Sequence, residues 1–309
     1  MRSQASVALV QTPALRAEQR ALADSLFGAA KPSSLLWTRT ADSGRRVNMF
    51  GLNIENTYLV PAARELISAA KEGRRTRAVF ANAHVINTIH TDAVYKATVA
   101  SADRIYADGS GMAIAARIAG RPLNDNVNGT DLFPLLCAEA KKAGVKIFLL
   151  GGKPGVAQRA AANVTAFGLG EAIGGVYHGY FVRGSREEDE IIARINASGA
   201  GIVLVGFGVP VQDIWIANNA HRLDAAVIAG VGGLFDFFAG TVERSPKIMR
   251  SFGCEWVWRL AMEPRRMARR YLIGNAVFLR HSVQEGVRVR QALRPAAALT
   301  VNSSETINR

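Results

Sequence analysis

Residues 145–165, VKIFLLGGKPGVAQRAAANVT, indicate the fold class of this chain. A continuous apolar run leads into a turn with 3 glycines and a proline, and a stretch with helical spacing of apolar residues follows. Apolar strands without polar alternation are typical of parallel sheets that are buried on both faces. The stretch therefore predicts a buried strand over 145–150, a glycine-rich turn at its carboxyl end and a helix over 156–165.

The same alternation of strand and helix extends on both sides of this unit. Further strands are predicted over residues 47–52, 77–81, 104–106, 172–177, 202–207 and 225–229. Further helices are predicted over residues 59–71, 83–99, 111–119, 131–142, 186–197 and 212–221. This spacing predicts an α/β fold, with a Rossmann-like parallel sheet and helices on both faces. Ligands of such folds bind at the carboxyl ends of the strands, so the site is expected there.

Composition excludes several other classes of protein. The 309 residues are 49% hydrophobic, enough to build a full core, so a disordered or fibrous chain is excluded. The 2 cysteines, Cys137 and Cys254, lie in no pairing or metal-ligand spacing, which predicts a reduced, cytoplasmic protein without a disulfide scaffold. The longest apolar stretch, 225–240, carries Asp236 and is shorter than the roughly 20 residues that span a bilayer. Any membrane contact is therefore expected to be peripheral.

The positive charge of the chain is concentrated outside the predicted core. The formal net charge is +13, yet residues 47–243 hold 18 acidic and 18 basic residues, whereas residues 244–294 hold 12 Lys and Arg against 3 Glu. We divide the chain into a mobile N-terminal extension (1–46), an α/β core (47–243), a basic helical appendage (244–294) and a disordered tail (295–309). This distribution favours an anionic partner for the appendage.

Glycine-rich turns follow three of the predicted strands, at residues 151–154, 206–210 and 230–233. A turn without Cβ atoms, followed by a helix N-terminus, suits a phosphate group, so a nucleotide ligand is one interpretation. The alternative is that glycine only permits tight connections. Three such turns in successive units favour the nucleotide, although neither a P-loop nor a dinucleotide fingerprint is present.

A single carboxylate is the candidate catalytic group. Asp108 follows the predicted strand 104–106 and precedes Gly109-Ser110-Gly111, so it is placed to accept a proton from an attacking hydroxyl. Its alternative role is to cap the helix that begins near Gly111. The 5 histidines form no metal-ligand set, so no metal is expected. Arginines, lysines and backbone amides would then have to stabilise a phosphate leaving group.

The appendage is predicted to carry an arginine-rich helical face. On a wheel at ~100° per residue, one arc of about 140° holds Arg265, Arg266, Arg269, Arg270 and Arg280, and the opposite side holds Met267, Tyr271 and Phe278. Such a helix, helped by Trp256 and Trp258, could lie on an anionic membrane. The alternatives are a helix packed on the body with a solvated arginine face, and a nucleic-acid-binding segment.

Eight ordered blocks between about residues 47 and 280 resemble the WecG/TagA/CpsF glycosyltransferases, glycosyltransferase family 26. They are ANA (81–83), YADGSG (106–111), NGTDL (128–132), FLLGGKP (148–154), HGYF (178–181), GVPVQDIW (208–215), GVGGLFD (230–236) and GCEWVWRL (253–260), the last followed by EPRR (263–266) and RRY (269–271). The family includes N-acetylmannosaminyltransferases and the xanthan-type glucosyltransferase GumM.

The resemblance implies an inverting, metal-independent transferase that needs no cofactor. It would move a hexose from a UDP-sugar onto a polyprenyl-diphosphate-linked sugar at the inner face of the cytoplasmic membrane. Asp108 falls on the family's general base, and Gln212 and Asp236 fall on positions that hold the nucleotide-sugar. The appendage arginines expected to close over the site and neutralise a diphosphate are Arg259, Arg266 and Arg269. The remaining expected substrate-binding residues are Asn82, Asn128, Gly151, Gly152 and Gly232.

The chain departs from the family pattern at two positions. Phe80 stands where many relatives have threonine, and Asn126 stands where many have arginine. Loss of these polar groups leaves both glucose and N-acetylmannosamine open as donor sugars, and we favour glucose and exopolysaccharide assembly. The rival hypotheses are a non-catalytic nucleic-acid-binding protein that uses the arginine-rich segment, and a sensor that binds a UDP-sugar without turnover. A homo-oligomer is possible.

Overall fold

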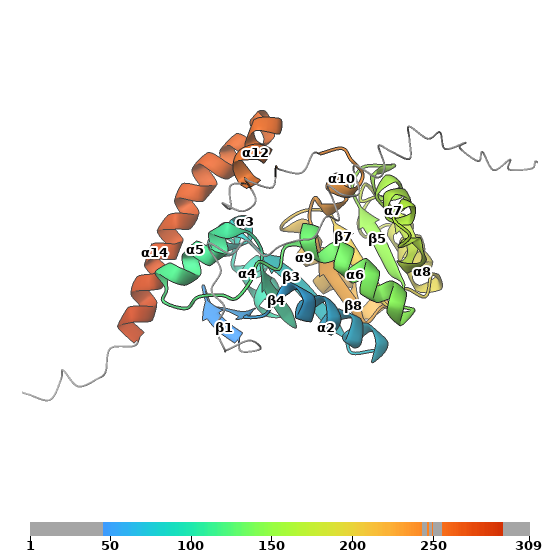
Figure 1. Ribbon diagram of the computed structural model, residues 1–309, viewed down its shortest axis with the longest axis horizontal. Coiled ribbons are helices and arrows are strands. Elements are labelled where there is room, and N and C mark those ends of the chain that lie inside the picture. The colour runs from blue at the N-terminus through green and yellow to red at the C-terminus, as the bar shows by residue number, and fades with distance from the viewer. Residues whose placement is uncertain (1–45, 243–245, 247–248, 250–254, 293–309) are drawn as a thin grey trace, which may run out of the picture.

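We describe the protein from a computed structural model (Figure 1). The structure describes residues 46–242 and 255–292, together with Pro246 and Met249 between them. The side chains of Glu255, Arg266, Arg269 and Arg270 are not described. The predicted N-terminal extension, apart from residue 46, and the predicted tail 295–309 lie outside the described residues.

An eight-stranded sheet forms the centre of the molecule, in the order β1-β2-β4-β3-β8-β7-β5-β6. The strands are β1 (Arg46–Met49), β2 (Leu52–Glu55), β3 (Thr76–Ala81), β4 (Arg104–Ala107), β5 (Ile147–Gly151), β6 (Ile173–Tyr177), β7 (Ile202–Gly206) and β8 (Val227–Gly230). All neighbouring pairs are parallel except β1 with β2. The predicted α/β class is therefore confirmed, and the predicted parallel sheet is parallel except for the β1–β2 pair.

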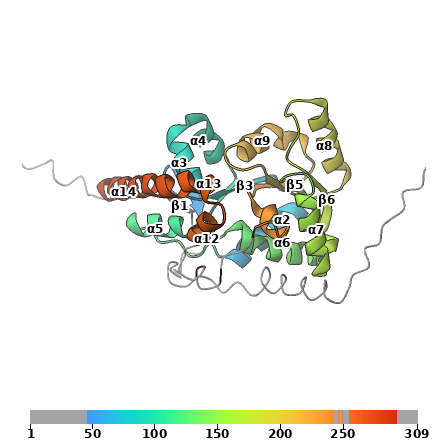
Figure 2. The same cartoon turned by 90° about the horizontal axis from the view of Figure 1, so that it is seen from above.

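Helices cover both faces of this sheet (Figure 2). One face carries α2 (Leu59–Lys71), α6 (Gly129–Ala143), α7 (Val156–Ala166) and α10 (Leu234–Phe238), together with a short 3-10 turn at Gly170–Ala172. The other face carries α3 (Ala83–Thr91), α4 (Ala93–Ala100), α5 (Ser110–Ile118), α8 (Arg186–Ala197) and α9 (Val211–Asn219). A second 3-10 turn, Ala220–Arg222, follows α9 on this face. Because successive strand residues point to opposite faces, Phe80 packs into the first layer and its neighbours Val79 and Ala81 into the second.

The strand predicted over 47–52 is wrong, because the chain reverses direction within it. Phe50 and Gly51 have φ values of 57° and 76°, and they form a two-residue turn that joins β1 and β2 as an antiparallel hairpin. Two central residues with positive φ match the right-handed twist of the strands on either side. The hairpin adds two strands at one edge of an otherwise parallel sheet.

The single helix predicted over 83–99 is also wrong, because it is interrupted at Asp92. This residue has extended backbone angles, φ −132° and ψ 105°, and its carboxylate accepts a 2.8 Å hydrogen bond from the backbone N–H of Tyr95. An aspartate in this conformation is a strong N-cap, so it starts a second helix and turns the chain. The break allows α4 to reach α9, where Tyr95 makes the buried contact described below.

The appendage consists of several helical segments instead of one continuous helix. They are α12 (Glu255–Met262), α13 (Pro264–Ala268), a π-helical segment (Arg269–Ile273) and α14 (Gly274–Ala292), which runs along α3 and α5 (Figure 1). The wheel drawn over 265–280 assumes 100° per residue throughout, and the π-helical turns break that assumption. Met267 and Phe278 are nevertheless buried.

Among the described residues, no helix combines the length and the apolar character that crossing a membrane requires.

Candidate active site at the carboxyl edge of the sheet

The candidate site lies where three neighbouring strands end. Asn82 directly follows β3, Asp108 directly follows β4, and the turn 230–233 follows β8. Adjacent strands are about 4.8 Å apart, so these groups line one short edge. The chain moves from one half of the sheet to the other near this point, and such a switch in strand order is the usual ligand-binding position of open α/β sheets.

Asp108 is held in place by its neighbours on two strands. Its backbone N–H donates a 2.8 Å hydrogen bond to the carbonyl of Ala81, and its Oδ2 accepts a 3.1 Å hydrogen bond from Nδ2 of Asn82. The oxygen of the same Asn82 amide caps α3 by accepting from the N–H groups of His84 and Val85. Asn82 therefore positions the carboxylate of Asp108 at the strand end.

Asp108 does not occupy the N-cap position of α5, which was its alternative interpretation. The residue before α5 is Gly109, which has φ 89° and makes no side-chain capping bond. Its N–H donates a 2.8 Å hydrogen bond to Oδ1 of Asn126, the residue that stands where relatives have arginine. Asn126 therefore shapes the backbone next to Asp108, a role that its position in the sequence does not indicate.

The turn after β5 requires glycine for close packing. A Cβ at Gly151 would lie 2.6 Å from the carbonyl oxygen of Gly206, and Gly152, with φ 70°, donates a 3.2 Å hydrogen bond to that oxygen. These contacts support the tight-connection interpretation at Gly151 and Gly152. Because β5 lies four strand spacings from β4, or roughly 19 Å, this turn and Asp108 cannot contact the same atom of a ligand.

Gln212 joins two of the glycine turns. Its side chain is 4% exposed, and its Oε1 accepts hydrogen bonds of 3.2 Å from the N–H of Gly208 and 2.8 Å from the N–H of Gly232. The amide oxygen is thus used by the protein, so it is not available to a ligand. The N–H groups of Gly208 and Gly232 are likewise used within the protein, so a phosphate would have to bind other N–H groups of these turns or of the helices that follow them.

Arg259 brings a cation from the appendage to the end of β8. Its Cζ lies 4.6 Å from the ring centroid of Phe237, and a Cβ at Gly233 would lie 3.0 Å from its Nη2 and 3.5 Å from Oδ2 of Asp236. Its Nε is buried and has no hydrogen-bond partner among the described residues. Arg259 and Asp236 therefore lie together beside the third glycine turn, although 23 positions separate them in the chain.

Asn128 lies beside this edge, because the N–H of the preceding Val127 donates a 3.0 Å hydrogen bond to the carbonyl of Ala107 at the end of β4. Asn128 caps α6, with its Oδ1 accepting from the N–H of Asp131 and its Nδ2 donating to that carboxylate, each at 2.8 Å. Its side chain therefore has a structural role. Arg266 lies in α13 and Arg269 begins the π-helical segment, but their side chains lie outside the described part of the structure.

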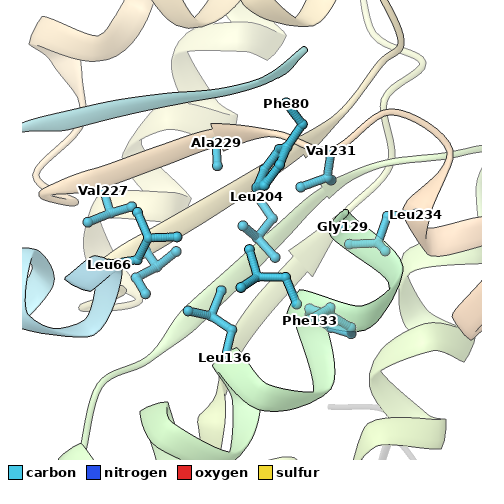
Figure 3. A pocket seen from close by; sticks show the side chains of 12 residues that line it. Leu66, Phe80, Gly129, Phe133, Leu136, Leu204, Val227, Ala229, Val231 and Leu234 are labelled. Carbon is cyan, nitrogen blue, oxygen red and sulfur yellow. The ribbon is translucent and has the colours of Figure 1, made fainter. Parts of the chain in front are cut away.

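An apolar cavity of about 10 Å³ lies beneath the candidate site, between the sheet and α6 (Figure 3). Phe80, Leu204, Phe133 and Leu234 are among the side chains that line it. The cavity is too small for a hexose and has no polar wall, so it is a packing defect of the core. Phe80 also stacks on Tyr106 at 5.7 Å, which places the family threonine position in the core below the edge.

Among the described residues, no group of three or more His, Cys, Asp or Glu side chains could hold a metal ion.

The fold defines an open α/β protein with a mostly parallel sheet, a class whose ligands bind at the carboxyl ends of the strands. A family model described as the glycosyl transferase WecG/TagA/CpsF family matches residues 47–292. The chain belongs to this family. It is thus assigned to the glycosyltransferases of polysaccharide biosynthesis, whose substrates in general are a sugar nucleotide and a lipid-linked acceptor.

Proposed function

We propose that this chain transfers a hexose from a UDP-sugar to a polyprenyl-diphosphate-linked sugar, with inversion at the anomeric carbon and without a metal ion. The observation that carries the proposal is the position of Asp108. It is the carboxylate at the end of β4, oriented by Asn82, on the edge where this fold class binds ligands. The N-cap position of α5 is taken by Gly109, so Asp108 stands one residue before the cap.

The proposed reaction is a direct displacement. Asp108 removes the proton from the attacking hydroxyl of the acceptor while that oxygen bonds to the anomeric carbon. The bond between the anomeric carbon and the diphosphate oxygen breaks, and UDP leaves with the bonding electrons. Arg259, at the end of β8, stabilises the negative charge that develops on the diphosphate.

The donor sugar is proposed to be glucose, with N-acetylmannosamine as the alternative. Phe80 is buried in the core, and Asn126 is occupied by the N–H of Gly109. Neither side chain offers the hydroxyl or the guanidinium that many relatives have at these positions. A donor that needs fewer polar contacts is consistent with both replacements, and the product would then enter exopolysaccharide assembly.

The appendage is proposed to bind the inner face of the cytoplasmic membrane. On α14, the side that packs against the body includes His281, Ser282 and Glu285, whereas Leu279, Val283 and Val287 are about half exposed. The side of a surface helix that faces only water is normally polar, and this side of α14 is not. Exposed apolar residues beside Arg280 and Arg290 suit an anionic lipid surface better than a nucleic acid, which offers no apolar layer.

The transfer is tested by incubating the full chain with UDP-glucose or UDP-N-acetylmannosamine and a short-chain polyprenyl-diphosphate sugar. We expect release of UDP only when the acceptor is present, and the same rate after addition of EDTA. Strict dependence on a divalent metal would contradict the mechanism. In parallel, UDP should raise the melting temperature more than ADP or NAD does, because a ligand bound by the native state alone stabilises it.

Membrane binding is tested with the double variant Leu279→Asp/Val283→Asp. Both side chains are exposed, so the fold should be retained, while the loss of apolar insertion should weaken binding to anionic vesicles at least about tenfold. The control is Val94→Asp/Val182→Asp, which alters two exposed valines on the surface of the α/β part of the chain, away from the appendage. Equal sedimentation of both double variants with the vesicles would refute the proposed surface.

A further inference from the structure

A buried tyrosine–carboxylate pair lies behind the glycine turns. Tyr95 of α4 is fully buried, Asp213 of α9 is 4% exposed, and the Tyr95 hydroxyl donates a 2.6 Å hydrogen bond to Oδ2 of Asp213. Burial raises the pKa of Asp213 to about 6, and the hydrogen bond from Tyr95 and the nearby side-chain amide of Gln212 limit the rise. A buried carboxylate destabilises the fold unless its surroundings compensate for it. The pair therefore contributes less to the stability of the fold than an apolar contact between α4 and α9 would.

Asp213 and Gln212 pack against the same point of the backbone. A Cβ at Gly230 would lie 2.6 Å from Nε2 of Gln212 and 2.7 Å from Oδ1 of Asp213. Oδ1 is buried and has no hydrogen bond of regular geometry, so the nearby amide N–H₂ of Gln212 is its source of electrostatic stabilisation. A carboxylate on this side favours the amide orientation in which Nε2 faces Asp213 and Oε1 faces the opposite way.

The glycine turns that contain Gly208 and Gly232 lie on the other side of the Gln212 amide, away from Asp213. In this orientation Oε1 accepts the N–H groups of Gly208 and Gly232, which lie at the ends of β7 and β8. With the amide reversed, the N–H₂ group would face these two donors and would repel them. The two turns would then lose their shared acceptor.

We infer that Tyr95 and Asp213 are positioning residues for donor binding, which act by keeping the Gln212 amide turned so that it holds the two glycine turns together. The inference rests on the proposed function, because it takes these turns to hold the diphosphate part of the sugar nucleotide. Tyr95 fixes Asp213, Asp213 orients Gln212, and Gln212 sets the spacing of the turns that receive the donor.

The test uses Asp213→Asn and Tyr95→Phe in the full chain. Asparagine keeps the shape of Asp213 but can present its own N–H₂ to Nε2 of Gln212, and phenylalanine removes the hydroxyl that fixes Oδ2. We expect each variant to raise KM for the UDP-sugar about tenfold, the equivalent of one hydrogen bond, with kcat at saturating donor within about twofold. Gln212→Ala should have a similar effect, and adding it to Asp213→Asn should raise KM little further.

The matched control is Tyr106→Phe, which also deletes a buried hydroxyl that donates to a carboxylate, here Glu65 at 3.2 Å. It should leave KM for the donor unchanged. If Asp213→Asn does not fold, Tyr95→Phe carries the test alone. KM values for Tyr95→Phe and Asp213→Asn equal to that of the control would overturn the inference.

Hydrogen exchange separates this inference from the proposed function. Amide exchange in the peptides that cover residues 206–212 and 230–234 should be faster in Tyr95→Phe and Asp213→Asn than in Tyr106→Phe. Suppose that the wild-type protein turns over no UDP-sugar but that exchange is faster in Tyr95→Phe and Asp213→Asn. The inferred contacts from Tyr95 through Asp213 to Gln212 are then correct and the proposed function is wrong. Unchanged exchange in both variants would refute the inferred role of Tyr95 and Asp213 even if the enzyme is active.

Discussion

Asp108→Asn is expected to lower kcat about 10²–10⁴-fold and to leave UDP binding unchanged. The amide keeps the size of the carboxylate and can still accept the hydrogen bond from Nδ2 of Asn82, but it cannot take a proton from the acceptor hydroxyl. The measurement is the initial rate of UDP release at saturating donor and acceptor, together with the UDP dissociation constant from calorimetry.

The control for this variant is Asp103→Asn, at the other end of the same strand. Asp103 precedes β4 and its Oδ2 accepts a 2.7 Å hydrogen bond from the backbone N–H of Arg77, which the oxygen of asparagine can also accept. The control should retain nearly all activity. A kcat for Asp108→Asn within about threefold of the wild type would remove Asp108 from the role of general base.

Arg259→Ala is expected to lower kcat/KM about 10²–10³-fold. The guanidinium is held over Phe237 beside the turn after β8, and its buried Nε has no partner among the described residues, so its charge is available to a diphosphate. Arg259→Lys should recover only part of the loss, because an ammonium is a point charge that cannot stack on the ring in the same way. The assay should use a short-chain acceptor, so that membrane binding does not contribute.

Arg194→Ala is the control for this second variant. Arg194 of α8 makes the same kind of contact, with its Cζ 5.5 Å from the ring centroid of Tyr177, and it comes from a helix of the core instead of the appendage. Its loss should change kcat/KM by less than about threefold. Equal activities of Arg259→Ala and Arg194→Ala would show that the appendage supplies no essential cation through Arg259.

Elements with a clear local pattern were predictable from the sequence. The helices α2 and α8 begin and end at the predicted residues, because the spacing of their apolar side chains repeats without interruption. The two main errors, at Phe50-Gly51 and at Asp92, are places where one or two residues reverse or interrupt a longer apolar pattern. Each carries a local signal, a glycine in the turn and an aspartate cap, that the longer pattern obscured.

The sequence predicted which residues lie at the strand ends of the candidate site, but not which atoms their side chains contact. Asp108 directly follows a buried strand, where a site residue was expected, and its carboxylate accepts a hydrogen bond from Asn82 at the neighbouring strand end. Asn128 and Gln212 have the residue types of ligand-binding groups, yet their side-chain oxygens accept backbone N–H groups of the protein. Residue type alone does not distinguish these two uses.

The α/β class, the apolar strands and the glycine turns at their ends follow from the amino-acid sequence, because each depends on residues close together in the chain. The order of the strands in the sheet determines which strand ends become neighbours, and therefore which side chains can act together. Tyr95 and Asp213 are 118 positions apart, and Arg259 reaches the turn after β8 from the appendage. Such contacts follow from strand order and helix docking, which burial of the whole core determines and no local pattern encodes.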